Sequence, residues 1–291
     1  MKINAYLVSS FGIDASGGNP AGVVLDADSL TDLQKKAIAK EIGFSETAFV
    51  QKSDKADFKV TFFTRVEEVD LCGHATIATY ALLFKNNVIK AGEYTQELKA
   101  GVLKVNVSEY GVIVMDQTLP SFKNIIKPEV IAKVLKIPDK WIISASLIPR
   151  VISTGLNDLI IPIDTRKHLF SIKPDDKRIA DFEKEHGLDS FHIFTFDIVS
   201  KEAVAHSRNL DPMHGIHEES ATGSSTGALA CYLFKNGKVH QEQLHNLLFE
   251  QGYSMGKPSQ ISVSLEVKRD EITRVQVGGR AIITGENNII V

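Results

Sequence analysis

The sequence has 291 residues, of which 43% are hydrophobic and 24% charged, and its formal net charge at pH 7 is −3. This length allows two domains with sizeable cores. The small negative charge argues against a broad surface for nucleic acid or an anionic membrane. Two cysteines, Cys72 and Cys231, make neither a disulfide framework nor a metal-ligand spacing. Signal-peptide and membrane-span patterns are absent, so we expect a reduced, cytoplasmic globular protein.

In chain order, strand-like segments dominate the first half. The glycines before Asn19 and Pro20 join two strands and do not open a helix, so they indicate a turn and no dinucleotide site. The Asn19 amide can still face a binding site. Ser29 or Thr31 can cap a helix, which Gly43 ends. We expect strands at 2–11, 21–25, 44–50, 58–64, 98–107 and 111–116, and helices at 30–41 and 71–86.

The segment 71–86, LCGHATIATYALLFKN, is repeated 150 residues later as 221–236, ATGSSTGALACYLFKN. Both copies are apolar on almost every side after a small, glycine-containing start, which is typical of a buried helix. The repeat therefore predicts two core helices in a duplicated fold. The matching positions are Gly73 and Gly223, Thr76 and Thr226, Ala78 and Ala228, Leu83 and Leu233, and the closing Phe-Lys-Asn of each copy.

The second half repeats the first more loosely. We place the boundary in the Lys- and Pro-marked stretch that begins near residue 120, which divides the chain into 1–118, joined by the strand 279–291, and 119–278. Strand-rich halves around one helix each predict an α+β fold of two pseudo-symmetric halves, each a curved, mostly antiparallel sheet. We expect strands at 147–151, 159–163, 191–199, 203–208, 261–267, 275–277 and 281–284, and helices at 129–135, 179–186 and 241–249.

Two residues are the leading candidates for chemistry. Glu46 has apolar neighbours in FSETAFV, and burial would raise its pKa toward the range in which it can accept and donate a proton. The alternative is a carboxylate at a strand edge that faces solvent. His74 follows Gly73 at a helix start, whose positive end favours a neutral imidazole. The alternative is a partly buried His satisfied by backbone groups.

The helix starts themselves can bind an anion. Gly73 and Gly223 leave backbone N–H groups accessible, and two such starts aimed together would hold a carboxylate. Ser224 and Ser225 can add hydroxyl groups to that pocket, or Ser224 can simply cap its helix. Glu219 stands beside the second helix as a second acid.

Other chemistries are less well supported. His214 and His217 lie three apart without an HExxH spacing, so no metal site is predicted. Amino-acid racemases that need no cofactor use a thiol where Cys72 lies and a second thiol across the site. The repeat places Thr222 at the position that corresponds to Cys72, so the second thiol is missing. No nucleophile elbow and no phosphate-binding loop occurs.

Six motifs in order give the chain a resemblance to the phenazine-biosynthesis PhzF-like isomerase family, within the diaminopimelate-epimerase fold. The resemblance covers essentially the whole length. The motifs are Gly18-Asn19-Pro20-Ala21-Gly22, Phe44-Ser45-Glu46-Thr47, Gly73-His74-Ala75-Thr76, Ala221-Thr222-Gly223-Ser224-Ser225, Gly252 with Met255-Gly256-Lys257-Pro258-Ser259, and Val277-Gly278-Gly279-Arg280.

The resemblance implies an isomerase of a biosynthetic process that moves a proton within a small carboxylate-bearing substrate, without cofactor or metal, as a homodimer. It implies Glu46, His74 and Glu219 as catalytic residues. Two departures make the phenazine precursor a doubtful substrate. Glu219-Ser220 replaces the usual Asp-Pro, and the residues at Cys72 and Ala75 differ from the usual ones. The substrate-binding residues implied are Asn19, Ser45, Gly73, Gly223 and Ser224.

Two alternative functions stay open at this point. One is an epimerase or racemase that uses Cys72 with a partner other than a thiol. The other is a binding protein for small carboxylates in which Glu46 is idle. Proton exchange on substrate carbon separates the last from both enzymes.

Overall fold

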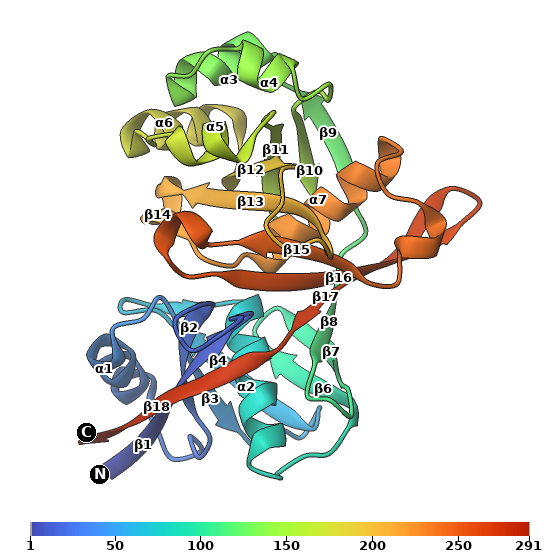
Figure 1. The fold of residues 1–291 in the computed structure, drawn as a ribbon. Coiled ribbons are helices and arrows are strands. Elements are labelled where there is room, and N and C mark those ends of the chain that lie inside the picture. Colours follow the sequence, from blue (N-terminus) through green and yellow to red (C-terminus); the bar gives the residue numbers. More distant parts are fainter. Residues whose placement is uncertain (1, 291) are drawn as a thin grey trace. The chain divides into compact units, whose positions relative to one another are not determined.

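The computed structural model describes residues 2–290, which form two compact units (Figure 1). Unit 1 is Met1–Asp116 with Gly278–Val291, and unit 2 is Gln117–Val277. Each unit combines strands that pair mostly antiparallel with one central helix, so the predicted α+β class is confirmed. Among the described residues, no helix is long and apolar enough to cross a membrane.

Unit 1 is a sheet that curves around helix α2. The strand order is β18-β1-β2-β3-β4-β6-β7-β8, with parallel pairing at β2–β3 and β4–β6 and antiparallel pairing elsewhere. Helix α2 packs on β1, β2, β3 and β18. The elements are β1 (Lys2–Ser10), β2 (Asn19–Val24), α1 (Asp32–Ile42), β3 (Thr47–Gln51), β4 (Phe58–Phe63), β5 (Glu68–Val69), α2 (Gly73–Lys85), β6 (Gly92–Leu98), β7 (Gly101–Val107), β8 (Ile113–Gln117) and β18 (Ala281–Ile290).

Unit 2 has the same plan around helix α7. The order β9-β10-β11-β12-β13-β15-β16 contains parallel pairs at β11–β12 and β13–β15, and α7 packs on β10, β11, β12 and β16. The elements are β9 (Ser121–Ile125), α3 (Pro128–Leu135), α4 (Lys140–Ile143), β10 (Arg150–Ser153), β11 (Asn157–Pro162), α5 (Arg166–Ser171), α6 (Asp176–His186), β12 (Ser190–Thr195), β13 (Ala203–Asp211), β14 (Ile216–Glu219), α7 (Gly223–Lys235), β15 (Leu247–Gln251), β16 (Ser259–Lys268) and β17 (Glu271–Gly279).

The repeated segments form the same helix in both units. Each helix has 13 residues, and most of them are buried, as an all-round apolar pattern requires. Thr76 Oγ1 donates to the Cys72 carbonyl at 2.8 Å, and Thr226 Oγ1 donates to the Thr222 carbonyl at 2.7 Å. The duplication therefore extends to individual hydrogen bonds in the first turn.

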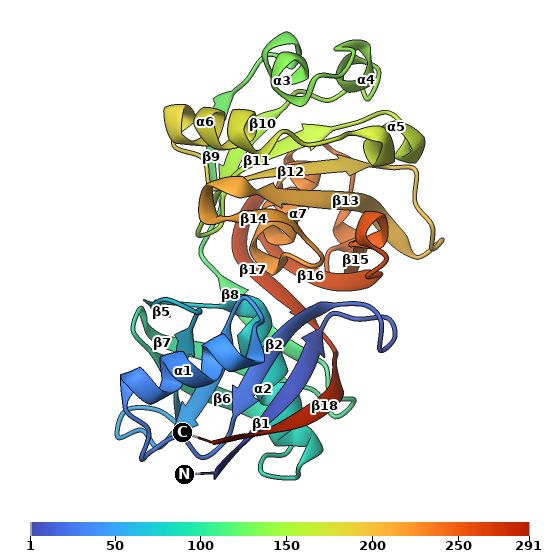
Figure 2. The ribbon, with the colours of Figure 1, turned by 90° about the vertical axis from the view of Figure 1, so that its left-hand side faces the viewer.

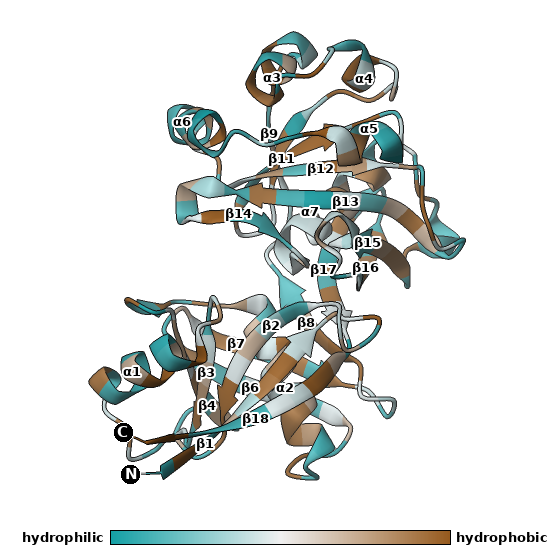
Figure 3. Cartoon of the chain, turned by 60° about the vertical axis from the view of Figure 1, so that its left-hand side comes forward, coloured by the Kyte–Doolittle hydropathy of each residue, from teal (hydrophilic) through white to brown (hydrophobic). Residues whose placement is uncertain are grey.

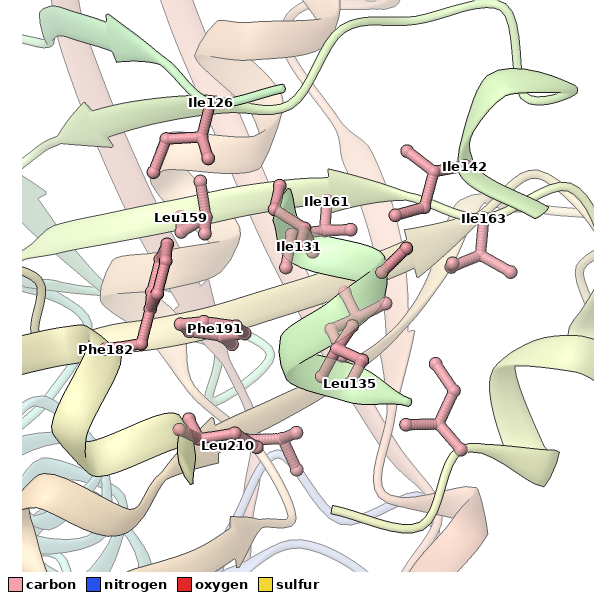
Figure 4. Packing of buried hydrophobic residues seen from close by; sticks show 14 of the residues in the cluster. Ile126, Ile131, Leu135, Ile142, Leu159, Ile161, Ile163, Phe182, Phe191 and Leu210 are labelled. Carbon is pink, nitrogen blue, oxygen red and sulfur yellow. The ribbon is translucent and has the colours of Figure 1, made fainter. Parts of the chain in front are cut away.

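A second apolar layer covers the outer face of the unit 2 sheet. Helices α3, α5 and α6 lie along β11 and β12 (Figure 2). Figure 4 shows Ile131 and Leu135 of α3 and Phe182 of α6 packed with Leu159 and Phe191 of the strands. This core holds the sheet from outside, while α7 holds it from inside.

Helix α1 confirms the predicted caps. Thr31 and Gln34 form a capping box, and Gly43 ends the helix in the left-handed region with φ 79°. Hydrophilic and hydrophobic residues alternate along α1 (Figure 3), and Ile38, Ala39 and Lys35 are buried. The cap therefore fixes where the chain leaves α1, three residues before Glu46.

Several predicted elements differ from the structure. The helix expected at 241–249 is wrong, because Leu247 and Phe249 are buried in strand β15 and only a short 3-10 turn precedes it. The strand expected at 44–50 begins at Thr47, so Glu46 precedes β3. In the segment 241–249, the pairing of β15 with β13 and β16 overrides the helical spacing of the sequence. Elements β5, β6, β9, β14, α4 and α5 were not predicted from the sequence.

Candidate active site

In unit 1, the bend after α1 places the side chain of Glu46. The Glu46 carbonyl accepts a hydrogen bond from Gly22 N–H of β2 at 3.2 Å, which fixes the backbone where β3 begins. Its side chain is 16% exposed. The alternative of a carboxylate pointing into solvent is therefore excluded.

The start of α2 brings two more side chains to this carboxylate. His74 Nε2 lies 3.3 Å from Glu46 Oε2. Cys72 Sγ lies 3.6 Å from His74 Nδ1 and 3.9 Å from His74 Nε2. Ser10 Oγ of β1 donates to the His74 carbonyl at 2.6 Å, which anchors the first turn of the helix. Glu46, Cys72 and His74 therefore form one compact polar cluster, which we call the triad.

The triad sets its own charge states. Burial alone would raise the pKa of Glu46, but close contacts with His74, Ser45 and Cys72 outweigh it and hold that pKa below its usual value. Burial alone would lower the pKa of His74, yet the Cys72 sulfur and the Glu46 carboxylate hold it well above its ordinary range. Burial raises the pKa of the Cys72 thiol, although the contact with His74 opposes this.

These directions correct two expectations. The predicted rise in the Glu46 pKa is wrong, because the contacts with His74 outweigh burial. The predicted neutral imidazole at His74 is also wrong, because an adjacent carboxylate stabilises imidazolium more than a helix start destabilises it. The cluster thus pairs a carboxylate with an imidazolium.

The other residues predicted in unit 1 lie around the triad to different degrees. Asn19 is 5% exposed. In the β1–β2 register it pairs directly with Ser10, the residue whose hydroxyl anchors the His74 backbone. Ser45 is exposed but contacts the Glu46 carboxylate. Gly73 begins α2, and the Cys72 side chain does not cap that helix in the described structure.

In unit 2, Gln251 organises the start of α7. Its side chain accepts from Thr222 N–H at 3.1 Å and donates to Thr222 Oγ1 at 3.0 Å and to the Glu219 carbonyl at 2.8 Å. Thr222 Oγ1 donates to the carboxylate of Glu219 and does not cap α7. Glu219 is thereby held at the N-terminus of α7.

Glu218 and Ser225, which lie near Glu219 in the sequence, contact buried side chains of unit 2. Glu218 forms a buried ion pair with Arg208, at 2.7 Å between Nη2 and Oε2. Ser225 Oγ donates to the buried Asp158 at 2.8 Å, so its hydroxyl supports the core and the expectation that it lines an anion pocket is wrong. Gly223 and Ser224 are partly exposed at the helix start.

Two functional candidates were not predicted from the sequence. Ser10 and Gln251 each anchor a helix start, and a polar residue directly before Gly252 was the only sign of the second. Cys72, which the sequence suggested only for an epimerase or racemase, contacts His74. His214 and His217 pair with separate acids, Asp211 and Asp176, each at 2.6 Å. In the described chain, the metal-ligating groups that converge are those of the triad, within 4.8 Å of one another.

Comparison with known proteins decides the family. The family model described as phenazine biosynthesis-like protein matches residues 8–287. This chain belongs to that family. The PhzF-family structure from Bacillus anthracis superimposes with a TM-score of 0.91 and 29% identity, and the match covers 100% of both chains. The predicted diaminopimelate-epimerase-like α+β fold and the predicted family are thereby confirmed.

Relatives of this PhzF-family chain are named isomerases. A Clostridium acetobutylicum protein named an uncharacterized isomerase is 31% identical and matches over 99% of this chain and 98% of its own length. The trans-2,3-dihydro-3-hydroxyanthranilate isomerase of Pseudomonas chlororaphis is 28% identical over 98% of both chains. The expectation of an enzyme of the isomerase type is confirmed at the level of the family.

Proposed function

We propose that this PhzF-family chain is a cofactor-independent isomerase in which Glu46 moves a proton between carbons of a small carboxylate-bearing substrate. The contact of Glu46 with His74, 3.3 Å apart at the start of α2, carries this proposal. A buried, ionised carboxylate can act as a general base, and an adjacent imidazolium can donate a hydrogen bond or a proton.

The proposed step conserves all atoms. The Glu46 carboxylate removes a proton from a substrate carbon, and the C–H electron pair moves into a π system conjugated with an acceptor group. His74 donates a hydrogen bond to the negative charge that develops. Glu46 then returns the proton to another carbon of the same molecule, so the carboxylate is regenerated and nothing is oxidised.

The helix starts support a role in substrate binding. The N-termini of α2 and α7, which begin at Gly73 and Gly223, carry the positive end of the helix dipole, which favours a bound carboxylate. We propose Asn19, Ser45, Gly73, Gly223 and Ser224 as binding residues and Glu219 as an assisting acid. Binding of one carboxylate by both helix starts, the homodimer and the cytoplasmic location stay predictions.

The substrate is proposed by class. The Pseudomonas relative acts on a dihydro-hydroxyanthranilate. This chain carries Glu219-Ser220 where the family motif has Asp-Pro, and Cys72 where other residues are usual. We therefore propose a small, unsaturated or readily enolised carboxylate and not that compound itself.

Hydrogen exchange tests this proposal. A panel of aromatic and aliphatic unsaturated carboxylates is incubated with the protein in heavy water and followed by NMR. Deuterium uptake at carbon, with a shift of the double bond in at least one member, is expected. Binding without any carbon-bound exchange across the panel would favour the carboxylate-binding alternative.

A further inference from the structure

The triad has a second property that proton transfer does not require. It combines a thiol, an imidazole and a carboxylate, and one ligating atom of each lies within 4.8 Å of the others. Glu46 Oε2 is buried and has no well-aligned hydrogen-bond donor among the described residues, although His74 Nε2 is near. A buried oxygen in this state is poorly satisfied by the protein alone.

Two of the three ligand–ligand separations can be compared with those of a tetrahedral metal centre. Bond lengths to zinc of about 2.3 Å for sulfur and about 2.0–2.1 Å for nitrogen and oxygen place neighbouring ligand atoms roughly 3.3–3.6 Å apart. In the triad, His74 Nε2 is 3.3 Å from Glu46 Oε2 and 3.9 Å from Cys72 Sγ. Cys72 Sγ also lies 3.6 Å from His74 Nδ1, and one ligating atom of each residue lies within 4.8 Å of the other two, so binding requires the His74 ring to turn and the side chains to draw closer by up to about 1 Å.

We propose that Glu46, Cys72 and His74 form a binding site for Zn²⁺ at the start of α2. A thiolate and an imidazole with a single carboxylate suit zinc, whereas Mg²⁺ and Ca²⁺ prefer oxygen ligands alone. Three protein ligands leave a fourth position for water or a substrate oxygen.

The surroundings of the triad favour such a site. Cys72 and His74 are each 8% exposed, and the Ser10 hydroxyl holds the His74 backbone, so two of the ligands are pre-positioned by α2 and β1. Glu46 is 16% exposed beside the exposed Ser45, which gives an ion a route to the ligands. Zn²⁺ binds thiolate and neutral imidazole, so its binding displaces the protons that these groups carry.

Zinc binding would switch off proton transfer. This consequence rests on the proposed function, since a carboxylate bound to the metal is no longer available as a base. The metal-bound chain is therefore the inactive form, and removal of zinc by a chelator restores exchange.

Cobalt spectroscopy tests the site without reference to activity. The full chain, treated with chelator and kept anaerobic, is titrated with Co²⁺. We expect a sulfur-to-cobalt charge-transfer band and the intense visible bands of tetrahedral Co²⁺, saturating at one ion per chain. Zn²⁺ should abolish both, because it binds such sites more tightly. Absence of the charge-transfer band in the wild-type chain would overturn the inference.

Paired cysteine variants localise the ligand. Cys72→Ser is expected to lose the charge-transfer band, while Cys231→Ser, which changes the buried cysteine of α7, should keep it. A band that survives Cys72→Ser, or is lost in Cys231→Ser with native circular dichroism, contradicts the assignment. The wild-type Co²⁺ titration tests the site without any variant, so the test does not depend on whether Cys72→Ser folds.

The zinc site and the proposed function fail in different ways. If the chelated chain exchanges substrate protons but shows no cobalt spectrum, the zinc site is wrong and the function stands. If cobalt binds as described but chelated chain and Glu46→Gln exchange no protons on any carboxylate of the panel, the zinc site stands and the function is wrong.

Discussion

The carboxylate of Glu218 accepts two hydrogen bonds from the guanidinium of Arg208, at 2.9 Å from Nε and 2.7 Å from Nη2. Both side chains are almost fully buried, and Arg208 Nη1 also donates to the Leu169 and Ile172 carbonyls. Glu219, the next residue, contacts Thr222 at the start of α7. Two adjacent acids of one motif thus have a structural and a proposed catalytic role.

The two acids should therefore respond differently to the same substitution. Glu218→Gln leaves the Arg208 charge buried without its counter-ion, so we expect unfolding to become easier by about 3–5 kcal/mol. Glu219→Gln should change stability little and reduce turnover. Urea unfolding and the exchange assay measure both, and equal stability losses in the two variants would contradict this division.

Glu46→Gln should reduce turnover by about 10²–10⁴-fold, the usual share of one acid–base group. The amide keeps the size of the side chain but cannot accept a proton from carbon. Glu93→Gln is a matched control, since Glu93 is exposed and pairs only with Lys104 among the ion pairs of the described chain. Turnover at the wild-type level in folded Glu46→Gln would remove Glu46 from the mechanism.

The sequence was sufficient for the parts of the fold that are local or repeated. The all-round apolar pattern of 71–86 and 221–236 predicted α2 and α7, and Thr31 and Gly43 predicted the ends of α1. The segment 241–249 was mistaken for a helix because its spacing fits both states, and only its neighbours β13 and β16 decide for a strand.

The charge states of Glu46 and His74 could not be predicted from the sequence, because they too depend on a contact between residues far apart in the chain. Glu46 and His74 are 28 positions apart, and each was judged by its own flanks. The flanks of Glu46 indicated burial, and the helix start at His74 indicated a neutral ring. The 3.3 Å contact between the two side chains reverses both conclusions.

Cys72→Ser separates the proposed isomerase from an epimerase that uses a thiol. In the proposed mechanism Cys72 only contacts His74, so serine should preserve turnover to within about one order of magnitude, short of the loss expected for an acid–base group. A thiol base would lose far more, because a serine hydroxyl ionises much less readily. Initial rates of deuterium uptake decide between them, with Cys231→Ser as control.

Asp158 makes the stability of the chain depend on pH. Burial, together with Asp189 and Asp211, raises its pKa to about 7 despite hydrogen bonds from Ser190 and Ser225. The folded state then holds a proton that the unfolded chain loses near pH 4, so the contribution of Asp158 to stability falls as the pH rises from about 4 to about 7.

Asp158→Asn should remove that slope. Relative to wild type, the variant should gain roughly 3 kcal/mol between pH 5 and pH 8, because about two pH units of the slope lie in that window. Urea unfolding at the two pH values gives this difference, in which groups common to both proteins cancel. The exposed Asp181→Asn serves as control. A difference independent of pH would show that Asp158 is ionised in the folded state throughout.

The backbone around Gly252 is closely packed beside the start of α7, and a substitution there measures how rigid that packing is. It has φ +82°, and a Cβ there would collide with the carbonyl oxygens of Lys257 and Ser220, the residue that follows Glu219. Gly256 has φ +67° with open space around it. Gly256→Ala should therefore cost only the left-handed penalty of about 1–2 kcal/mol. Gly252→Ala should cost at least about 1–3 kcal/mol more, because backbone must move.

Urea unfolding compares the stability of the two variants. Equal losses would mean that the backbone at Ser220 and Lys257 moves without a cost in free energy. If it is as rigid as the contacts indicate, Gly252→Ala should also lower turnover more than Gly256→Ala, through the displacement of Glu219.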